Sequence, residues 1–304
     1  MPTENPAPDR RVFVGVPIRN GGDTLRHALD SLLAQTHADL TIFLSDNASS
    51  DDTAEVCAEY LARDGRIRYH RHEHPLTAIQ NWRFAYEQAD APYFMWSADD
   101  DLHSSDFVEE LLAALEANPR CGLAFGQIVH FTDYAHWADQ PVYDYHCDTR
   151  GRSITYRLWH DKNGPFFPYG LQRPGLLADY QWYEHTVSPD WPLAIYLLAT
   201  TDIVQVERPR FYYKGPGHVI PHEVRAATQS FSDPEDYLTV RLAWRCALAT
   251  SEATRRIGKR RVLLVDFAVI FAGILWANRR RLLSSVREDL RTRGRRRDGA
   301  PSTS

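Results

Sequence analysis

The chain of 304 residues carries a net charge of −5, with 43% hydrophobic and 25% charged residues. This length can bury a real core, either in one large α/β domain or in one domain with a smaller appended region. The charge is uneven, because residues 251–304 hold fourteen Arg and Lys against five Asp and Glu, which leaves the first 250 residues acidic. An acidic body excludes a typical nucleic-acid partner, whereas a basic segment beside apolar residues suits an anionic lipid surface.

The start of the chain and its cysteines indicate the compartment. Residues 1–10 are polar and proline-rich, which predicts a disordered start and no secretory signal. The four cysteines have no CxxC spacing, so neither a zinc site nor a disulfide framework is indicated. We therefore expect a cytoplasmic protein.

Strands and helices alternate over the first hundred residues. The apolar run 11–16 predicts a buried strand closed by Pro17, and Thr24 is the expected N-cap of the helix that follows. The further elements predicted from apolar spacing are a helix over 24–35, a strand over 40–44, a helix over 51–63, a strand over 66–70, a helix over 78–89 and a strand over 93–97. This alternation predicts βαβ units, whose ligands bind outside the carboxyl ends of the strands.

The second half of the chain shows fewer regular patterns. We expect a helix over 108–117, a strand over 121–131, a helix over 191–201 and a strand over 204–213 that Pro209 interrupts. The segment 132–185 is aromatic and rich in loops, and it shows no clear periodicity. Residues 291–304 form a basic, low-complexity tail that we expect to be disordered.

Three consecutive carboxylates, Asp99, Asp100 and Asp101, follow the strand at 93–97. Their mutual repulsion is costly unless a divalent cation offsets it, and Asp oxygens are hard ligands suited to Mg²⁺ or Mn²⁺. Such an ion would also bridge the oxygens of a diphosphate. The alternative is a solvated helix N-terminus, a role that Asp106 fits better than the triplet does.

A second polar loop, SDNASSDDT, follows the strand at 40–44. Asp46 can accept hydrogen bonds from a pyrimidine ring or a ribose hydroxyl, and Asn47 offers both a donor and an acceptor. Ser49, Asp51 and Asp52 are more typical of helix caps. Neither GxGxxG nor GxxxxGK[ST] occurs, which disfavours a dinucleotide fold or a P-loop.

Five segments follow one another along the chain, namely VGVPIRN, SLLAQTH, SDNASSDDT, NWRFAYEQADAPYFMWSADDDLHSSDF and SPDWPLAIYLLATTDIVQVERPRFYYKGPG. Together and in this order they resemble glycosyltransferase family 2 of the GT-A type. The resemblance implies an α/β GT-A fold, a Rossmann-like nucleotide-binding domain with a mixed central sheet, here with a C-terminal helical extension. The expected regions are 1–10 disordered, 11–220 the GT-A domain (11–130 for the nucleotide-sugar, 131–220 for the acceptor), 221–290 helical and 291–304 the basic tail.

The implied activity is an inverting transfer of a hexosyl group from a nucleotide-diphosphate donor, a UDP-sugar above all, with Mn²⁺ or Mg²⁺ bound. The acceptor would be a hydroxyl of a glycan, a lipid-linked saccharide or a small molecule. The positions carried over as nucleotide-sugar contacts are Pro17, Arg19, Asn20, Asp46, Asn47, Asn81 and Asp99, and those for the metal are Asp100 and Asp101. Which of the three Asp residues touches the ion stays open. Gly21 stands where the family often has Glu, so one nucleotide contact is replaced or absent.

Inverting transfer needs a base that takes the proton of the acceptor hydroxyl. Asp190, in SPDWPL, matches the later acidic position of the family, and its alternative role is the N-cap of the helix that follows. Glu184 and Asp179 are the reserve candidates. Trp182, Tyr183 and Trp191 are candidates for stacking on a sugar or for core packing.

Two histidine groups and one apolar segment complete the expectations. His70, His72 and His74, and the pair His218 and His222, lack further ligands at metal spacing, which favours solvated or ring-packing side chains. Residues 262–277 are apolar with Arg on both sides, but shorter than a membrane span and interrupted by an Asp. They predict either a buried C-terminal helix or a peripheral helix on the inner membrane face.

Two rival functions remain at this point. A sugar nucleotidyltransferase also needs a metal, but it would carry a Gly-rich phosphate loop with Arg or Lys after the first strand, and PIRNGGD is a poor version of one. The other rival is a catalytically inactive member of the family that acts as a binding module in polysaccharide biosynthesis. Carboxylates at all the expected positions disfavour it.

Overall fold

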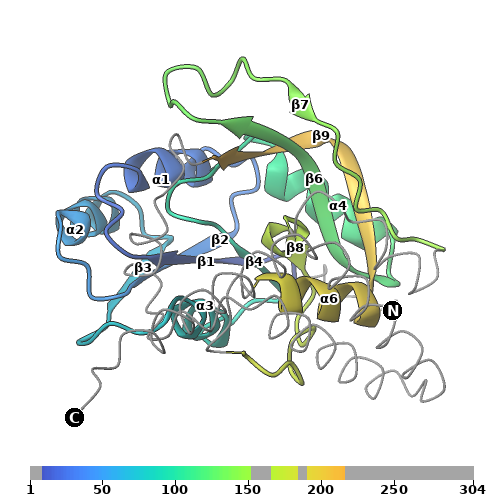
Figure 1. The fold of residues 1–304 in the computed structure, drawn as a ribbon, viewed down its shortest axis with the longest axis horizontal. Coiled ribbons are helices and arrows are strands. Elements are labelled where there is room, and N and C mark those ends of the chain that lie inside the picture. The colour runs from blue at the N-terminus through green and yellow to red at the C-terminus, as the bar shows by residue number, and fades with distance from the viewer. Residues whose placement is uncertain (1–8, 152–165, 184–189, 216–304) are drawn as a thin grey trace, which may run out of the picture.

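The computed structural model describes residues 9–151, 166–183 and 190–215. One nine-stranded sheet runs through this part of the chain (Figure 1). Its strands are β1 (Val12–Ile18), β2 (Leu40–Asp46), β3 (Ile67–Arg71), β4 (Tyr93–Trp96), β5 (Leu102–His103), β6 (Cys121–Phe131), β7 (Val142–Tyr143), β8 (Leu171–Gln172) and β9 (Asp202–Lys214). The helices are α1 (Leu25–Leu33), α2 (Thr53–Arg63), α3 (Ala78–Glu87), α4 (Phe107–Ala117), the 3₁₀ turn η1 (Phe167–Tyr169) and α6 (Asp190–Thr200).

The sheet is mixed. Its order is β3-β2-β1-β4-β8-β6-β9-β5, with β7 added beside β6. The first four strands are parallel, β8 is antiparallel to both its neighbours, and β6 and β9 are parallel. The expected α/β fold with a mixed central sheet is therefore confirmed.

Helices cover both faces of the parallel strands. In Figure 1, α3 lies on one side of β1 and β2, while α1 and α2 lie on the other. Every residue of β1 is buried, as expected of a central parallel strand whose two faces are both covered. The helical periodicity explains α1, since its buried side chains recur every three or four residues, namely Leu25, Ala28, Leu29 and Leu32.

Pro17 lies inside β1, not at its end as the sequence predicted. It pairs with Ser45 of β2, and β1 continues to Ile18 opposite Asp46. On the other side β4 pairs with β1 only as far as Gly15. Beyond Gly15 the strand is bordered by one neighbour, so a residue without an N–H is tolerated there. Thr24 is the N-cap residue of α1, as expected, but its hydroxyl donates to the Gly21 carbonyl and caps no N–H.

Strand β9 is longer than expected, and Pro209 lies in an irregularity within it. The register of β6 against β9 shifts between Phe125 and Gln127, so that residues 206–209 have no partners in β6. Such a bulge bends a strand and redirects the part that follows. The last residues of β9 then pair with β5, which follows directly on the acidic triplet.

Several expectations fall outside the described residues. These are the C-terminal helix at 262–277, the basic tail, His218, His222 and Glu184. The domain boundaries therefore stay predictions. In the ranges that the structure does describe, no helix is long and apolar enough to cross a membrane.

Candidate active site

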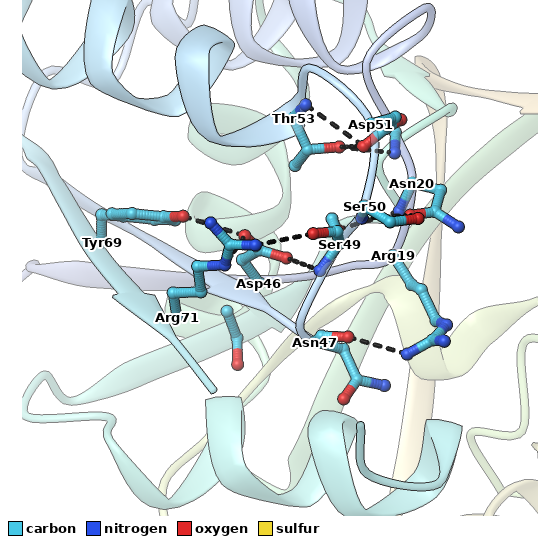
Figure 2. A network of polar contacts seen from close by, with 12 residues as sticks. Arg19, Asn20, Asp46, Asn47, Ser49, Ser50, Asp51, Thr53, Tyr69 and Arg71 are labelled. Atoms are coloured by element: carbon cyan, nitrogen blue, oxygen red, sulfur yellow. Dashed lines mark hydrogen bonds and ion pairs between the residues drawn. The ribbon is translucent and has the colours of Figure 1, made fainter. Parts of the chain in front are cut away.

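The loops after β1 and β2 are held together by polar contacts (Figure 2). The Asn20 N–H donates to Ser49 Oγ at 2.9 Å, and Asn20 Oδ1 accepts from the Ser50 N–H at 2.9 Å. Asn20 adopts a φ of 54°, a left-handed conformation that Asn tolerates better than most residues. Asn20 therefore attaches the first loop to the second through both its backbone N–H and its side chain.

A second set of contacts secures the next residues of the first loop. The Gly21 N–H donates to Thr53 Oγ1 at 2.9 Å, and the Gly22 N–H donates to Asp51 Oδ2 at 3.0 Å. The Thr53 hydroxyl in turn donates to Asp51 Oδ1 at 2.5 Å. Asp51 therefore joins the two loops besides accepting from the Thr53 N–H at the start of α2.

Asp46 ends β2 and is fully buried. Its Oδ1 accepts from the Ser49 N–H at 2.9 Å, and its Oδ2 accepts from the Tyr69 hydroxyl at 2.9 Å. The Arg71 Nε lies 3.6 Å from Oδ2, and the same guanidinium donates to the Ser49 carbonyl (Figure 2). In the structure Asp46 thus organises the second loop, and a contact with the base stays a prediction.

The other predicted nucleotide contacts have clear neighbours too. Asn47 exchanges two hydrogen bonds with the backbone of Leu76, and its carbonyl accepts from Arg19 Nη1 at 2.8 Å. Asn81, on α3, is buried; it accepts from the Ser45 hydroxyl at 2.6 Å and donates to the Ser45 carbonyl at 3.0 Å. Asn81 therefore attaches α3 to β2 rather than extending from a loop.

Asp99 lies against the first loop. A Cβ at position 21 would come within 2.5 Å of Asp99 Oδ2, so Gly21 makes room for this carboxylate. Burial and then the charge of Asp100 raise the pKa of Asp99 to about 7, while a hydrogen bond from the Arg19 backbone opposes the rise. The missing side chain at position 21 thus brings the backbone of the first loop onto the triplet.

Asp101 is the most buried member of the triplet, with 1% of its surface exposed. Its Oδ1 accepts from the Lys214 N–H at 2.8 Å, but its Oδ2 is buried without a hydrogen-bond partner in the part of the chain that the structure describes. Burial and the charge of Asp100 raise the pKa of Asp101 well above 3.8. An unpartnered buried carboxylate oxygen is costly, which is the condition a bound cation relieves.

Asp100 is positioned by an aromatic residue that the sequence did not single out. The Tyr134 hydroxyl donates to the Asp100 carbonyl at 2.8 Å, and the Tyr134 ring stacks on His27 of α1 at 4.1 Å. The segment after β6 therefore reaches back over the triplet. Nothing local marks Tyr134 in the sequence, since only the path of the chain after β6 brings it there.

Asp190 is the first residue of α6 and is half-buried. Its link to the triplet is Tyr169 of η1: burial and then the carboxylates of Asp101 and Asp190 raise the pKa of that phenol well above its ordinary value. The structure thus brings Asp190 and Asp101 to one tyrosine, from segments far apart in the sequence. The reserve candidate Asp179 lies in the turn after β8.

The donor atoms suit a hard cation that completes its shell with ligand oxygens. Among the residues described, no group of three His, Cys, Asp or Glu side chains could hold a metal ion on its own. Mg²⁺ and related ions are commonly bound through one or two carboxylates together with substrate phosphates. Asp100 and Asp101, with the unpartnered Oδ2, fit that arrangement.

Most of the rings noted in the sequence pack against other rings, whereas the His70 and His74 side chains stay exposed. His70 and His72 contact each other at 4.8 Å and both contact Phe84, in line with ring-packing histidines. Trp182 packs on Trp96 and Tyr180, and Tyr183 is buried. These contacts agree with core packing.

Comparisons with known proteins agree with this geometry. Residues 13–171 match the sequence model of Glycosyl transferase family 2. Glycosyltransferase GlyG of Streptococcus pneumoniae is 29% identical over 100 residues, which span a third of each chain. Glycosyltransferase GlyA of the same organism is 32% identical over 34% of this chain, but only 15% of its own length is matched.

Two solved structures share the fold. S. aureus TarS 1–349 in complex with UDP aligns with a TM-score of 0.59 over 86% of this chain and 72% of its own, at 15% identity. The mannosyltransferase PcManGT from Pyrobaculum calidifontis, in complex with GDP-Man and Mn²⁺, aligns with a TM-score of 0.50 over 89% and 90%, at 14% identity. With the family match covering more than half of its length, the chain belongs to glycosyltransferase family 2 and has a GT-A fold.

Proposed function

We propose that the chain is an inverting, metal-dependent transferase that moves a sugar from a nucleotide diphosphate to an acceptor hydroxyl. The observation that carries this proposal is the convergence at one edge of the sheet. There the buried Asp101 Oδ2 has no hydrogen-bond partner among the residues described, and the backbone of the first loop lies against Asp99. Parallel strands present their loops at this edge, where α/β sheets bind nucleotides.

The donor is a nucleotide-diphosphate sugar, with a UDP-sugar as the first choice. Structural neighbours were solved with UDP, UDP-GlcNAc and GDP-Man, which supports the class of donor. Pro17, Arg19, Asn20, Asp46 and Asn47 supply the nucleotide side. Asp99 faces the ribose, and Asn81 supports the pocket from α3.

The metal would be Mn²⁺ or Mg²⁺, and Asp100 and Asp101 would hold it. When bound, it would supply positive charge that offsets the negative charge of the diphosphate. The neighbour PcManGT was solved with Mn²⁺, which supports this class of ion. The residues of the chain itself hold the ion, orient the donor and exclude water around Asp101.

Asp190 acts as the base. Its carboxylate takes the proton of the acceptor hydroxyl, while the bond from the anomeric carbon to the diphosphate breaks on the opposite face of the sugar. Asp190 and Asp101 both raise the pKa of Tyr169, and this shared neighbour supports the role of Asp190. Residues 131–220 form the acceptor side, where a saccharide or a lipid-linked saccharide would bind.

The decisive experiment combines donor binding with two substitutions. Full-length protein is screened by thermal shift against UDP-, GDP- and dTDP-sugars with Mn²⁺, because a ligand of the folded state raises its stability. Asp100→Ala and Asp190→Ala should each abolish transfer from the donor that binds, while the far-UV circular dichroism stays that of wild type. Glu55→Ala, at an exposed carboxylate of α2, is the matched control and should transfer normally. Full turnover in both site variants would refute the mechanism.

Two further assays separate the rivals. Incubation with a nucleoside triphosphate and a sugar phosphate would yield a nucleotide-sugar only if the chain is a nucleotidyltransferase. Calorimetry that detects no metal-dependent nucleotide binding would favour an inactive binding module. Under our proposal the first assay yields no product and the second detects binding.

A further inference from the structure

Lys214, the last residue of β9, lies at the acidic triplet although 113 residues separate it from Asp101. The pairing of β5 with β9 sets Leu102 opposite Tyr212, two residues before Lys214. The backbone N–H of Lys214 then donates to Asp101 Oδ1 at 2.8 Å. Two contacts in the backbone therefore fix where this side chain begins.

The ammonium group of Lys214 lies close to the triplet, but it forms no ion pair with these three carboxylates. Its Nζ lies 5.3 Å from the centre of the Tyr134 ring, whose hydroxyl donates to the Asp100 carbonyl. No ion pair within 4.0 Å involves Lys214 among the residues that the structure describes. Burial raises the pKa of Asp100, and the nearby Lys214 charge opposes that rise.

The charge balance of the site leaves a role for this cation. The donor carries two negative charges on its diphosphate, and the released nucleoside diphosphate carries a third near neutral pH, because a terminal phosphate loses its second proton with a pKa of about 6. The proposed divalent ion would share its charge with the carboxylates of the triplet. A further positive charge beside the metal meets the charge that appears as the sugar leaves, and such contacts lower the barrier more than they tighten donor binding.

We propose that the Lys214 ammonium binds the diphosphate leaving group, an inference that rests on the transferase function proposed above. The bond from the anomeric carbon to the β-phosphate oxygen breaks, and its electron pair stays on that oxygen. The acceptor oxygen forms the new bond and its proton passes to Asp190. Lys214 donates hydrogen bonds to the diphosphate, while Tyr134 keeps the ammonium on the metal side.

The test uses Lys214→Met in the full-length protein, because Met keeps the length of the side chain and the backbone N–H that Asp101 accepts. By titration calorimetry with Mn²⁺ present, its affinity for UDP should fall about tenfold, the loss expected for one hydrogen bond to a charged group. The affinity for UDP-GlcNAc should fall less, because the intact donor carries one charge fewer. Mn²⁺ alone should bind as tightly as to wild type or more tightly, since a repelling charge is gone.

Kinetics and two further variants complete the test. Lys214→Met should lower kcat by more than it raises the donor KM, and Lys214→Arg should recover most of the UDP affinity. Arg208→Met removes a charge from the same strand, where Arg208 pairs with the surface residue Glu110. This control should leave both kcat and the UDP affinity unchanged.

Three results would overturn the inference. One is equal UDP affinity in Lys214→Met and wild type. Another is a parallel loss of Mn²⁺ affinity, which would mean that the residue only supports the structure. If wild type itself binds neither UDP nor GDP with Mn²⁺, the proposed transferase function fails and the inference falls with it, so the two failures are distinguishable.

Discussion

The two carboxylate oxygens of the buried Asp101 differ in their hydrogen bonding. The Lys214 N–H bonds Oδ1, whereas Oδ2 has no partner in the described part of the chain. Burial and the adjacent carboxylate of Asp100 raise its pKa, so the metal-free protein bears an energetic cost at this residue. A site that binds a cation commonly carries such a cost in the absence of the ion.

The first prediction concerns Asp101→Asn without metal. Because the folded state of wild type holds a proton on Asp101 at pH values where the unfolded chain has lost it, wild-type stability falls as pH rises above about 4. Asn does not titrate and still accepts from Lys214. The free energy of unfolding of Asp101→Asn, relative to wild type, should therefore increase from pH 5 to pH 8 in urea titrations.

With saturating Mn²⁺, wild type should be more stable than Asp101→Asn, because the ion stabilises wild type and binds the variant poorly. The buried histidines titrate alike in both proteins and cancel in the difference. A variant that is less stable than wild type at every pH, by an amount independent of pH, would contradict the prediction.

Tyr134 allows a second prediction at a single atom. Tyr134→Phe removes the hydroxyl that bonds the Asp100 carbonyl but keeps the ring on His27. We expect a loss of about 1 kcal/mol in unfolding free energy, the usual value of one such hydrogen bond. Mn²⁺ affinity, measured by calorimetry, should fall because the acidic loop is less constrained. Tyr143→Phe, at an exposed ring of β7, is the control and should leave both unchanged.

At the scale of elements, the start of α2 connects the loops that follow β1 and β2. Thr53 is fully buried, accepts from the Gly21 N–H and donates to Asp51. Its hydroxyl thereby links α2 to the loop after β1, which lies against Asp99. The two loops are therefore positioned by contacts between helix and strand ends.

The third prediction tests this connection. Thr53→Val has almost the same shape but leaves the buried Gly21 N–H without its acceptor and removes one of the hydrogen bonds to Asp51. Urea denaturation should show a loss of about 1–3 kcal/mol, the cost of unpaired buried polar groups. UDP binding with Mn²⁺ should weaken as well. Thr53→Ser retains the hydroxyl, and a Ser variant as impaired as Val would refute the explanation.

At the scale of the whole molecule, one sheet connects two groups of strands in the described part of the chain. Strands β1 to β4 carry the loops that contain Asn20, Asp46 and the triplet, whereas β6 leads to Tyr134 and β9 ends at Lys214, beside the triplet. The pairing of β5 with β9 brings the two groups together around Asp101.

The fourth prediction concerns the basic C-terminal segment, which we propose binds the inner face of the membrane. Its excess of Arg over acidic residues should attract anionic lipid, so the full-length protein should sediment with phosphatidylserine vesicles at low salt. Neutral vesicles and about 0.5 M salt should abolish the binding, since salt screens surface charges. Changing Arg279, Arg280 and Arg281 to Ser should weaken it. Failure to bind anionic vesicles would favour the buried helix.

Local sequence patterns were sufficient to predict the strands and helices of the first hundred residues, and they also revealed the resemblance to the family. The strands at β1, β2 and β4 and the amphipathic helices between them are local patterns, and each is recognisable within a dozen residues. The triplet and Asp46 stand at strand ends, where the βαβ alternation predicts ligands. These features could be predicted because neighbouring residues alone specify them.

The surroundings of the triplet depend on long-range contacts. Tyr134 and Lys214 reach it through a chain reversal after β6 and through the pairing of β9 with β5, and the bulge at Pro209 sets the direction of that strand. The same fold buries Asp101 Oδ2 with no partner in the ranges that the structure covers. Contacts between residues far apart depend on strand register and burial, which no local pattern of residues encodes.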